Sequence, residues 1–350
     1  METYSKIHNL LNLWQAFTKA SKGRRSKPSV ASFEYNLEAE LIELRDELRN
    51  ETYLPGNYDN FTVHEPKRRL ISAAPFRDRV VHHALINVIG EPLERKFIHD
   101  SYANRVGKGT HKALDRCTYF MRCHQYVLQC DVTQFFPSID HQILNGILSR
   151  NVRDKRTMRL VGLILASGEG ILKNEYDMVY FAGDDLLAAN RPRGLPIGNL
   201  TSQFWANVYL NELDQFVKRT LKVRAYLRYV DDFVLFSNDK TQLKEWRFAL
   251  IEFLAKLRLT MHENRAHAQA CKSGIPFLGF IVFPDHRRLK PAKGYAFQRR
   301  LRALHKALLN GEIERKALDI RLLAWAAHAS HGDTFGLRRA ILASQGLLHG

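Results

Sequence analysis

The sequence has few cysteines and no long apolar run. Its cysteines form no C-x-x-C pair and are too sparse for a disulfide scaffold, which argues against a zinc ribbon and a small secreted fold. No apolar stretch reaches about 18 residues and no apolar h-region opens the chain, so we expect neither a membrane span nor a secretory signal. We therefore expect a cytoplasmic protein with reduced cysteines, namely Cys117, Cys123, Cys130 and Cys271.

Acidic residues are fewer than basic residues in this sequence. Asp and Glu number 36 against 53 Lys and Arg, which gives a formal net charge of +17 and a pI near 9.8. Such an excess favours a polyanionic partner, because each phosphate that a cation neutralises releases condensed counterions. A basic protein without such a ligand is the alternative, since net charge affects association and does not determine the fold. The 350 residues are enough for two or three subdomains around a large core.

Two adjacent carboxylates, Asp231 and Asp232, lie between two short apolar runs. Residues 225–227 and 233–236 are rich in aromatic and β-branched residues, a pattern that predicts two strands meeting at a tight turn. Like charges so close repel one another and are costly to desolvate. A solvated turn is the common explanation of such a pair, and a divalent metal held by oxygen ligands is the alternative that compensates the charge.

A third carboxylate follows another strand-like run. Residues 126–136 begin with an apolar run that ends at Asp131, and bulky rings follow it. If the two predicted strand regions lie side by side, Asp131 meets Asp231 and Asp232 at the end of one sheet. Three carboxylates there can hold two Mg²⁺ ions about 3.5–4 Å apart, the geometry of in-line phosphoryl transfer.

Helical periodicity and capping residues mark other segments. A helix with Ser32 as its N-cap is predicted to run from Phe33 to Leu48, and a second helix is predicted to follow an N-cap at Asn199. The basic run at 22–27 is equally consistent with a solvated loop and with a phosphate contact. The Gly-Lys-Gly-Thr segment at 107–110 lacks the spacing of a P-loop, so we expect a mobile loop that opens a helix.

Taken in order, these segments resemble the motifs of reverse transcriptases. The runs that end at Asp131 and at the aspartate pair 231–232 are similar to motifs A and C, which carry the palm aspartates of that family. The remaining motifs are similar to motif B, the basic fingers motif, the primer-grip hairpin and motif D, at 193–203, 67–72, 277–280 and Arg265. Each motif is weak alone, but the ordered set covers about residues 60–284.

The resemblance implies an α+β fold, a right-hand polymerase with fingers, a palm of antiparallel sheet plus helices, and a short helical thumb. We expect an N-terminal extension and fingers in residues 1–125. The palm is expected in 126–284, with the chain re-entering the fingers at about 141–195. Residues 285–350 are basic and are expected to form a thumb that clamps a duplex backbone.

The resemblance also implies a role for each motif residue. Asp131, Asp231 and the Val132 carbonyl oxygen would bind two Mg²⁺ ions, with Mn²⁺ as a substitute, and Asp232 would chiefly support the catalytic site electrostatically. The expected contacts to the incoming nucleotide come from four motif segments, through Lys67, Arg69, Phe136, Ile197, Gly198, Gln203 and Arg265. The expected contacts to primer and template come from Tyr229, Phe277, Leu278, Gly279, Arg299 and Arg300.

Ile197 departs from many reverse transcriptases, which have glutamine before the motif B glycine. A branched aliphatic side chain cannot donate a hydrogen bond, and the absence of one hydrogen bond of roughly 0.5–1.5 kcal/mol loosens nucleotide discrimination several-fold. This form of motif B is similar to that of diversity-generating retroelements, whose enzymes copy a template RNA with errors concentrated at adenines. The resemblance to that group extends over nearly the whole chain.

The expected function is therefore RNA-directed DNA polymerisation at low fidelity. The enzyme would make cDNA from a structured template RNA and dNTPs in a bacterial or phage retroelement, and a small basic accessory protein would help to bind the RNA. A phage-defence reverse transcriptase that acts on a dedicated noncoding RNA is the close alternative. The alternative from another class is a catalytically silent RNA-binding protein with a polymerase fold.

Overall fold

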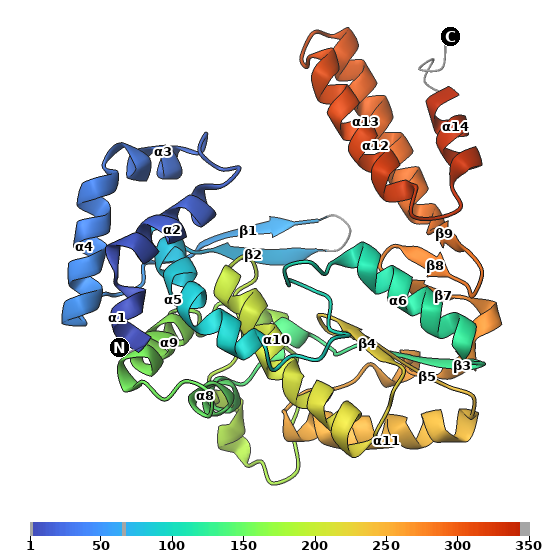
Figure 1. The fold of residues 1–350 in the computed structure, drawn as a ribbon, viewed down its shortest axis with the longest axis horizontal. Coiled ribbons are helices and arrows are strands. Elements are labelled where there is room, and N and C mark those ends of the chain that lie inside the picture. The colour runs from blue at the N-terminus through green and yellow to red at the C-terminus, as the bar shows by residue number, and fades with distance from the viewer. Residues whose placement is uncertain (1–2, 65–67, 344–350) are drawn as a thin grey trace.

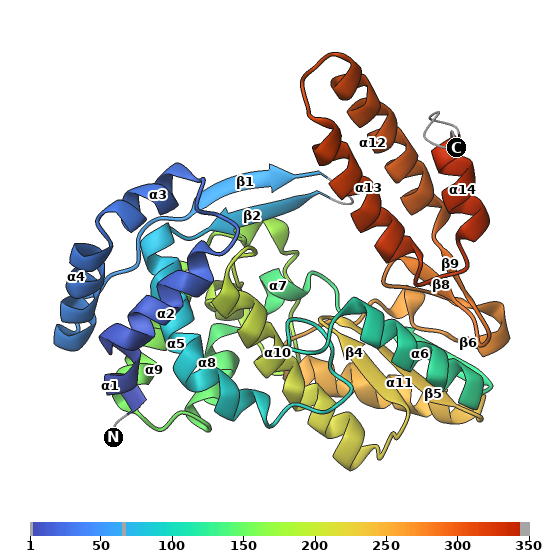
Figure 2. The same cartoon turned by 45° about the horizontal axis from the view of Figure 1, so that its top comes forward.

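The structure is a computed structural model that describes residues 3–64 and 68–343 (Figure 1). Its N-terminal part consists of helices, a two-stranded antiparallel hairpin and a long helix. These elements are α1 (Thr3–Ile7), α2 (Leu10–Ser21), α3 (Pro28–Tyr35), α4 (Leu37–Asn50), β1 (Asp59–Val63), β2 (Arg69–Ala73) and α5 (Phe76–Glu94). The helix α2 packs along α5, and this pair places the N-terminal segment beside the elements that carry motif B (Figures 1 and 2).

The predicted helix from Phe33 to Leu48 with an N-cap at Ser32 is wrong. The structure divides this segment into α3 and α4 at Asn36, whose φ of −107° and ψ of 28° are not helical. Ser32 lies inside α3, which starts at Pro28, a residue suited to the first helical position. In α3, Phe33 stacks on the ring of Phe17, with 5.8 Å between the ring centroids.

The central sheet has four strands in the order β4-β5-β3-β6 and is antiparallel throughout. Its strands are β3 (Tyr126–Cys130), β4 (Tyr226–Tyr229), β5 (Asp232–Ser237) and β6 (Ala268–Ala270). The sheet is built from segments far apart in the chain, because β3 pairs with β5 across a connection of about a hundred residues. The helices on the connection and beyond it are α7 (Phe135–Ser138), α8 (His141–Ser149), α9 (Lys155–Ser167), α10 (Leu200–Gln215) and α11 (Lys240–Lys256).

Both faces of this sheet are covered, and side-chain alternation assigns each residue to one of them. One face packs into the large core shared with α10 and α11, through Leu128, Cys130, Phe233 and Leu235. The other face packs into a second core with the helix α6 (Thr110–Cys123), through Val127, Leu227, Val234 and Phe236. The second face is the one that Asp131 and Asp232 share by the same alternation.

A second small sheet connects the palm to the C-terminal helices. Strands β7 (Ile275–Phe277), β8 (Phe280–Val282) and β9 (Arg287–Leu289) form it in sequence order. The C-terminal helices α12 (Pro291–Leu309), α13 (Arg315–Ala329) and α14 (Phe335–Ala343) have a small core of their own. In both views they rise from this end of the molecule, and the β1–β2 hairpin points toward them from the other end (Figures 1 and 2).

The arrangement has the fingers, palm and thumb of the expected right hand. The domain limits at 125, 284 and 141–195 stay predictions, and the stretch after residue 284 starts with strand β9 before its first helix. In the ranges 3–64 and 68–343, no helix combines the length and the apolar character that crossing a membrane requires.

Candidate active site

The tip of the β4–β5 hairpin is a two-residue turn that presents Asp231. Tyr229 pairs with Asp232, and Val230 between them has a φ of 57°, a left-handed conformation that short hairpins require and that β-branched residues rarely adopt. The Arg228 guanidinium donates to the Val230 carbonyl oxygen at 2.8 Å and so fixes the turn from behind. A side chain two residues earlier in the chain, on β4, thus holds Val230 in this conformation.

Asp131 is brought to this turn by strand register. Cys130 pairs with Phe233, so Asp131 follows at the level of Asp232, and its carbonyl oxygen accepts from the His262 amide at 2.8 Å. The two carboxylates act on each other: burial, and then the charge of Asp131, raise the pKa of Asp231 to about 6. The predicted convergence of Asp131 with the hairpin tip is therefore present in the structure.

The charge at this site is only partly compensated. Arg69 and Arg228 lower the pKa of Asp231, but burial and Asp131 outweigh them. Within the described ranges no group of three or more acidic, histidine or cysteine side chains is arranged to hold a metal ion, so a single preformed cluster of all three aspartates is not seen. The Asp131 and Asp231 pair, with its elevated pKa, is a donor set that suits a hard divalent cation.

The fingers hairpin contributes Arg69 to the site. Arg69 opens strand β2 and is close enough to act electrostatically on Asp231. Its neighbour Arg68 instead forms an ion pair with Glu175 at 2.9 Å, so the two arginines have different partners. Lys67 lies outside the described residues, so its triphosphate role stays a prediction.

Motif B is hydrogen-bonded to the fingers strand. The Ile197 carbonyl oxygen accepts from the Ser72 amide at 2.8 Å, and its side chain is half-buried. Gly198 has a φ of 120°, and a Cβ there would lie 3.0 Å from Ile71 Cγ2, so only glycine fits. Ile197 and Gly198 thus lie against the hairpin that carries Arg69.

Asn199 does not cap helix α10 with its side chain, although it occupies the predicted N-cap position. Its amide instead joins motif B to the fingers, because Oδ1 accepts from the Ala74 amide at 3.0 Å and Nδ2 donates to the Ser72 carbonyl oxygen at 2.8 Å. The Asn199 side chain thus bonds to residues 125 and 127 positions away and not to the first turn of its own helix. Sequence periodicity does not indicate such distant partners. Asn199 is a positioning residue that the sequence analysis missed.

The remaining nucleotide candidates lie around this centre. Phe135 is buried, and Phe136 is half-buried against it with ring centroids 5.4 Å apart. Gln203 is exposed on α10. Arg265 is exposed shortly after Met261, which bridges to Val132 next to Asp131.

Some of the candidate residues for primer and template binding lie at the β7–β8 turn, and one of them lies in the core. Leu278 and Gly279 form the β7–β8 turn, with φ of 45° and 92°, whereas Phe277 is 1% exposed and packs in the core beneath it. Phe277 therefore supports the tip and offers no side-chain surface to a nucleic acid. Tyr229 is fixed by its hydroxyl, 3.0 Å from Thr110 Oγ1 at the start of α6, which begins where the loop 107–110 was expected to open a helix.

Arg299 and Arg300 are both exposed on α12, whereas Leu301 and Leu304 of the same helix are buried. Helix α12 therefore has an apolar face that packs inward. It also leaves the basic side on the surface, where a duplex backbone could be reached. Contact with primer or template stays a prediction for both arginines.

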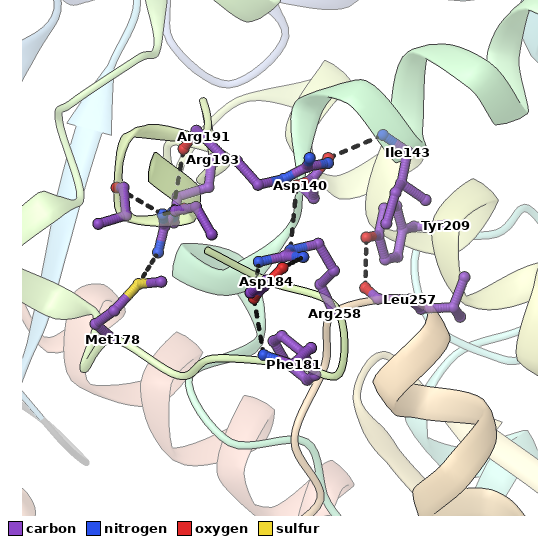
Figure 3. Close-up of polar contacts among 12 residues, drawn as sticks. Asp140, Ile143, Met178, Phe181, Asp184, Arg191, Arg193, Tyr209, Leu257 and Arg258 are labelled. Atoms are coloured by element: carbon purple, nitrogen blue, oxygen red, sulfur yellow. Dashed lines mark hydrogen bonds and ion pairs between the residues drawn. The ribbon is translucent and has the colours of Figure 1, made fainter. Parts of the chain in front are cut away.

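A polar network fixes the segment between motifs A and B against the palm (Figure 3). Arg258 donates to both carboxylate oxygens of Asp184 at 2.6 and 2.7 Å, and this contact holds the pKa of Asp184 down to about 2. Asp140 caps helix α8 through the Ile143 amide and accepts from Arg191 Nε at 2.7 Å. Local sequence patterns do not indicate this network, because its arginine–aspartate hydrogen bonds join residues 51 and 74 positions apart.

The sequence also contained one overlooked signal, the arginine inside an apolar strand. Arg228 is fully buried, and its guanidinium donates to Asp214 on α10 at 2.7 and 2.8 Å. Asn207 Oδ1 accepts from the same guanidinium at 3.1 Å. A charged residue at a core position of a strand requires a buried partner, so this position was recognisable even though the partner was not.

The comparisons with known proteins agree with this geometry. The sequence profile described as "Reverse transcriptase (RNA-dependent DNA polymerase)" matches residues 63–282, more than half of the chain. This chain belongs to the reverse transcriptase family. The expected class of enzyme is thereby confirmed, and the protein is an RNA-directed DNA polymerase.

Two curated relatives of this reverse transcriptase differ in how much they share with it. Protein YkfC of Escherichia coli K12 is 27% identical over 352 residues, which cover 84% of this chain and 86% of YkfC. The group II intron-encoded protein LtrA of Lactococcus lactis subsp. cremoris is 24% identical, over 51% of this chain and only 28% of LtrA. Membership of the diversity-generating type is not established by either relative.

A solved structure shows the same fold at low sequence identity. The apo telomerase of Candida tropicalis, truncated from its C-terminal domain, aligns with a TM-score of 0.50 and 10% identity. The alignment covers 67% of this chain and 55% of the telomerase. At such identity the likeness concerns the fold alone, and it confirms the expected right-hand polymerase architecture.

Proposed function

We propose that this reverse transcriptase extends a primer on a template RNA by Mg²⁺-dependent nucleotidyl transfer at Asp131 and Asp231. The observation that carries the proposal is the meeting of these two carboxylates at the hairpin tip, where burial and the charge of Asp131 raise the pKa of Asp231 to about 6 despite Arg69 and Arg228. Bound Mg²⁺ supplies charge neutralisation and a lowered pKa of the attacking hydroxyl. The carbonyl oxygen of Val132 is an additional candidate ligand, and Asp232 adds negative charge to the same face of the sheet.

The surrounding residues hold the reactants. Arg69, with Lys67, grips the triphosphate from the fingers side, opposite the aspartates. Gly198 lets the nascent base pair approach the backbone of motif B, and Phe136 packs against the sugar where a 2′-hydroxyl would be. Tyr229 and the β7–β8 tip locate the primer end.

The direct test is primer extension by the purified protein and by its Asp231→Ala variant. We expect dNTP incorporation that requires Mg²⁺ in the unsubstituted enzyme and is absent in the variant. Sequencing the RNA and cDNA that copurify with each protein identifies the template and the priming point. RNA binding that depends on salt, with no Mg²⁺-dependent incorporation by the unsubstituted protein, would instead favour a silent RNA-binding protein.

A more specific part of the proposal is that the enzyme synthesises cDNA with low fidelity. It rests on Ile197, whose main chain is fixed by Ser72 and whose side chain offers no hydrogen bond to a nucleotide. Replacing Ile197 by glutamine restores an amide at that position. We expect misincorporation opposite template adenine to fall roughly two- to twelvefold, the effect of one hydrogen bond of about 0.5–1.5 kcal/mol.

The control for this experiment is Ile197→Leu, which keeps an apolar side chain of the same volume. Errors should be counted by sequencing cDNA made on one template by all three proteins. An unchanged error spectrum in Ile197→Gln would remove the basis for low fidelity. A neighbouring variable-repeat gene favours a diversity-generating retroelement, whereas an isolated gene beside a structured noncoding RNA favours phage defence.

A further inference from the structure

A basic cavity of about 220 Å³ adjoins motif B on the side of the N-terminal helices. Three segments meet there: the end of α2 with the turn that follows it, the first half of α5, and the start of α10. The packing of α2 on α5 and of α5 on α10 brings these segments together (Figures 1 and 2). The wall includes Gly198 and Gln203, so the cavity reaches the turn that supports the nascent base pair.

The charge of this wall is positive and unbalanced. Lys19, Lys22, Arg24 and Arg79 contribute to it, and no acidic side chain of the described residues lines it. Lys22 and Arg24 are exposed and form no ion pair with any described residue, and Arg79 uses only its Nε, which donates to the Ala74 carbonyl oxygen at 2.8 Å. Burial and then Arg24 lower the pKa of Arg79, against the weaker opposite effect of Asp59.

Two histidines add neutral polar groups to the same wall. His82 is 1% exposed, and its Nδ1 has no hydrogen-bond partner among the residues that the structure describes. A buried polar atom without a partner is costly, and the ring that carries it belongs to the wall of a cavity lined by cations. Burial lowers the pKa of His82 to about 3, and burial with Lys19 and Arg24 lowers that of His83 to about 4. Both rings are therefore neutral near pH 7 and can donate one hydrogen bond each.

The size and the position of the cavity decide which anion fits. At about 220 Å³ it is smaller than the roughly 300–1,000 Å³ of sites that enclose a small molecule. It has room for a phosphate group but not for a whole nucleotide. Its cations also come from elements other than the β1–β2 hairpin that carries Arg69, so they are additional to the proposed triphosphate contacts.

A larger groove of about 650 Å³ continues from the cavity and shares Lys19 and His83 with it. Its wall contains Glu91 and Glu94 as well as arginines, and Glu94 pairs with Arg105 at 3.0 Å. The mixed charge of the groove confines the anion site to the smaller cavity beside motif B. A chain with a phosphate in the cavity could extend into the groove without a second strong phosphate contact.

We propose that this cavity binds backbone phosphate of single-stranded RNA as the strand approaches motif B. The inference rests on the proposed function, since it names where the uncopied template contacts the protein. It assigns the basic run after α2 to a phosphate contact, one of the two interpretations that the sequence left open. Lys22 and Arg24 provide exposed cations, the half-buried Arg79 provides guanidinium donors, and the His82 ring completes the wall.

The test compares two variants that lose the same charge. Lys22→Gln/Arg24→Gln removes two cavity cations, and Arg153→Gln/Lys155→Gln removes two exposed cations near α9. Binding of a labelled 12-nucleotide single-stranded RNA and of a blunt RNA–DNA duplex is measured by fluorescence anisotropy over a range of salt concentrations. We expect the cavity variant to bind the single strand on the order of tenfold more weakly. Its salt slope should fall by about 0.7 for each phosphate that the variant no longer neutralises.

Duplex binding should stay unchanged in the cavity variant, and the control variant should retain both affinities. Equal single-strand binding by the two variants overturns the proposal. Because both substituted residues in the cavity variant are exposed, misfolding is not expected, and a thermal denaturation curve checks this. These binding measurements remain decisive even if the protein proves unable to extend any primer.

A kinetic measurement separates template phosphate from nucleotide phosphate. Primer extension is compared on templates with a one-nucleotide and a ten-nucleotide 5′ overhang. We expect the cavity variant to raise the KM for the long-overhang template only, with the KM for dNTP unchanged on both. A raised KM for dNTP on both templates overturns the proposal and assigns the cavity to the incoming triphosphate.

Discussion

Two carboxylates close to the β4–β5 hairpin meet opposite electrostatic surroundings. Asp214 lies fully buried against Arg228, and its oxygens accept from the guanidinium at 2.7 and 2.8 Å. Asp231, three residues after Arg228, instead meets Asp131, and its pKa rises to about 6. The compensated site stabilises the fold, whereas Arg69 and Arg228 offset the negative charge at Asp231 only in part. Arg228 connects the two sites, because it also donates to the Val230 carbonyl oxygen in the turn that presents Asp231.

The largest effect on activity is expected from the substitution Asp231→Asn. Removing a charge that holds a catalytic cation is expected to lower the primer-extension rate by about 10³-fold or more, since such ions contribute several kcal/mol to transition-state stabilisation. Thermal denaturation without Mg²⁺ should show no loss of stability, because the variant relieves repulsion from Asp131. The exposed Asp285→Asn is the control and should retain full activity. A variant at position 231 with normal extension would contradict the assignment.

The opposite result is expected at the compensated site. Asp214→Asn leaves the Arg228 charge buried without its counter-charge, and we expect the free energy of unfolding to fall by about 3–5 kcal/mol. Chemical denaturation of the purified variant measures this change. A matched double variant, Asp214→Leu with Arg228→Met, removes both charges and should recover much of the loss. A decrease below about 1 kcal/mol for Asp214→Asn would mean that water or another group compensates Arg228.

The smallest effect expected in this comparison is the pH dependence of stability. Asp231 has a folded pKa of about 6 against an ordinary value of 3.8. Its stabilising contribution is therefore complete below pH 3.8 and is lost as the pH rises through about 6, where the unfavourable charge forms. Between pH 4 and pH 7.5, without Mg²⁺, the Tm of the unsubstituted protein should decline relative to that of Asp231→Asn.

Magnesium should reverse this decline only where the carboxylate is ionised. We expect Mg²⁺ to raise the Tm of the unsubstituted protein at pH 7.5 and to have little effect at pH 5, because protons and the cation compete for Asp231. The Asp231→Asn variant should respond weakly at both pH values. A Mg²⁺ effect of equal size in the two proteins would place the main cation site elsewhere.

Much of the catalytic centre was predictable because local patterns encode it. The apolar runs that end at Asp131 and flank Asp231 form paired strands, and their register brings the carboxylates together. Helix α10 begins directly after Asn199, as the periodicity predicted. The role of Asn199 was not predictable, since its side chain contacts the fingers strand rather than its own helix.

Pattern reasoning failed where the partners are distant. The helix predicted across Asn36 is broken because Phe33 packs against rings from two other helices. The Asp184–Arg258 pair joins residues 74 apart, and no spacing rule connects them. Sequence periodicity reports which face of an element is apolar, but not which element covers that face.

The sequence by itself determined the class of the enzyme, the strands that carry its aspartates, and the basic character of the chain. These features follow from short-range order, since alternation, caps and motif residues act within a few positions of one another. Only the tertiary structure decided how charge is distributed among the carboxylates, giving Asp214 an arginine and Asp231 a second acid. It also decided that the basic run after α2 shares a cavity with α5 and motif B. Electrostatic environment depends on distance in space, which the linear order of residues does not contain.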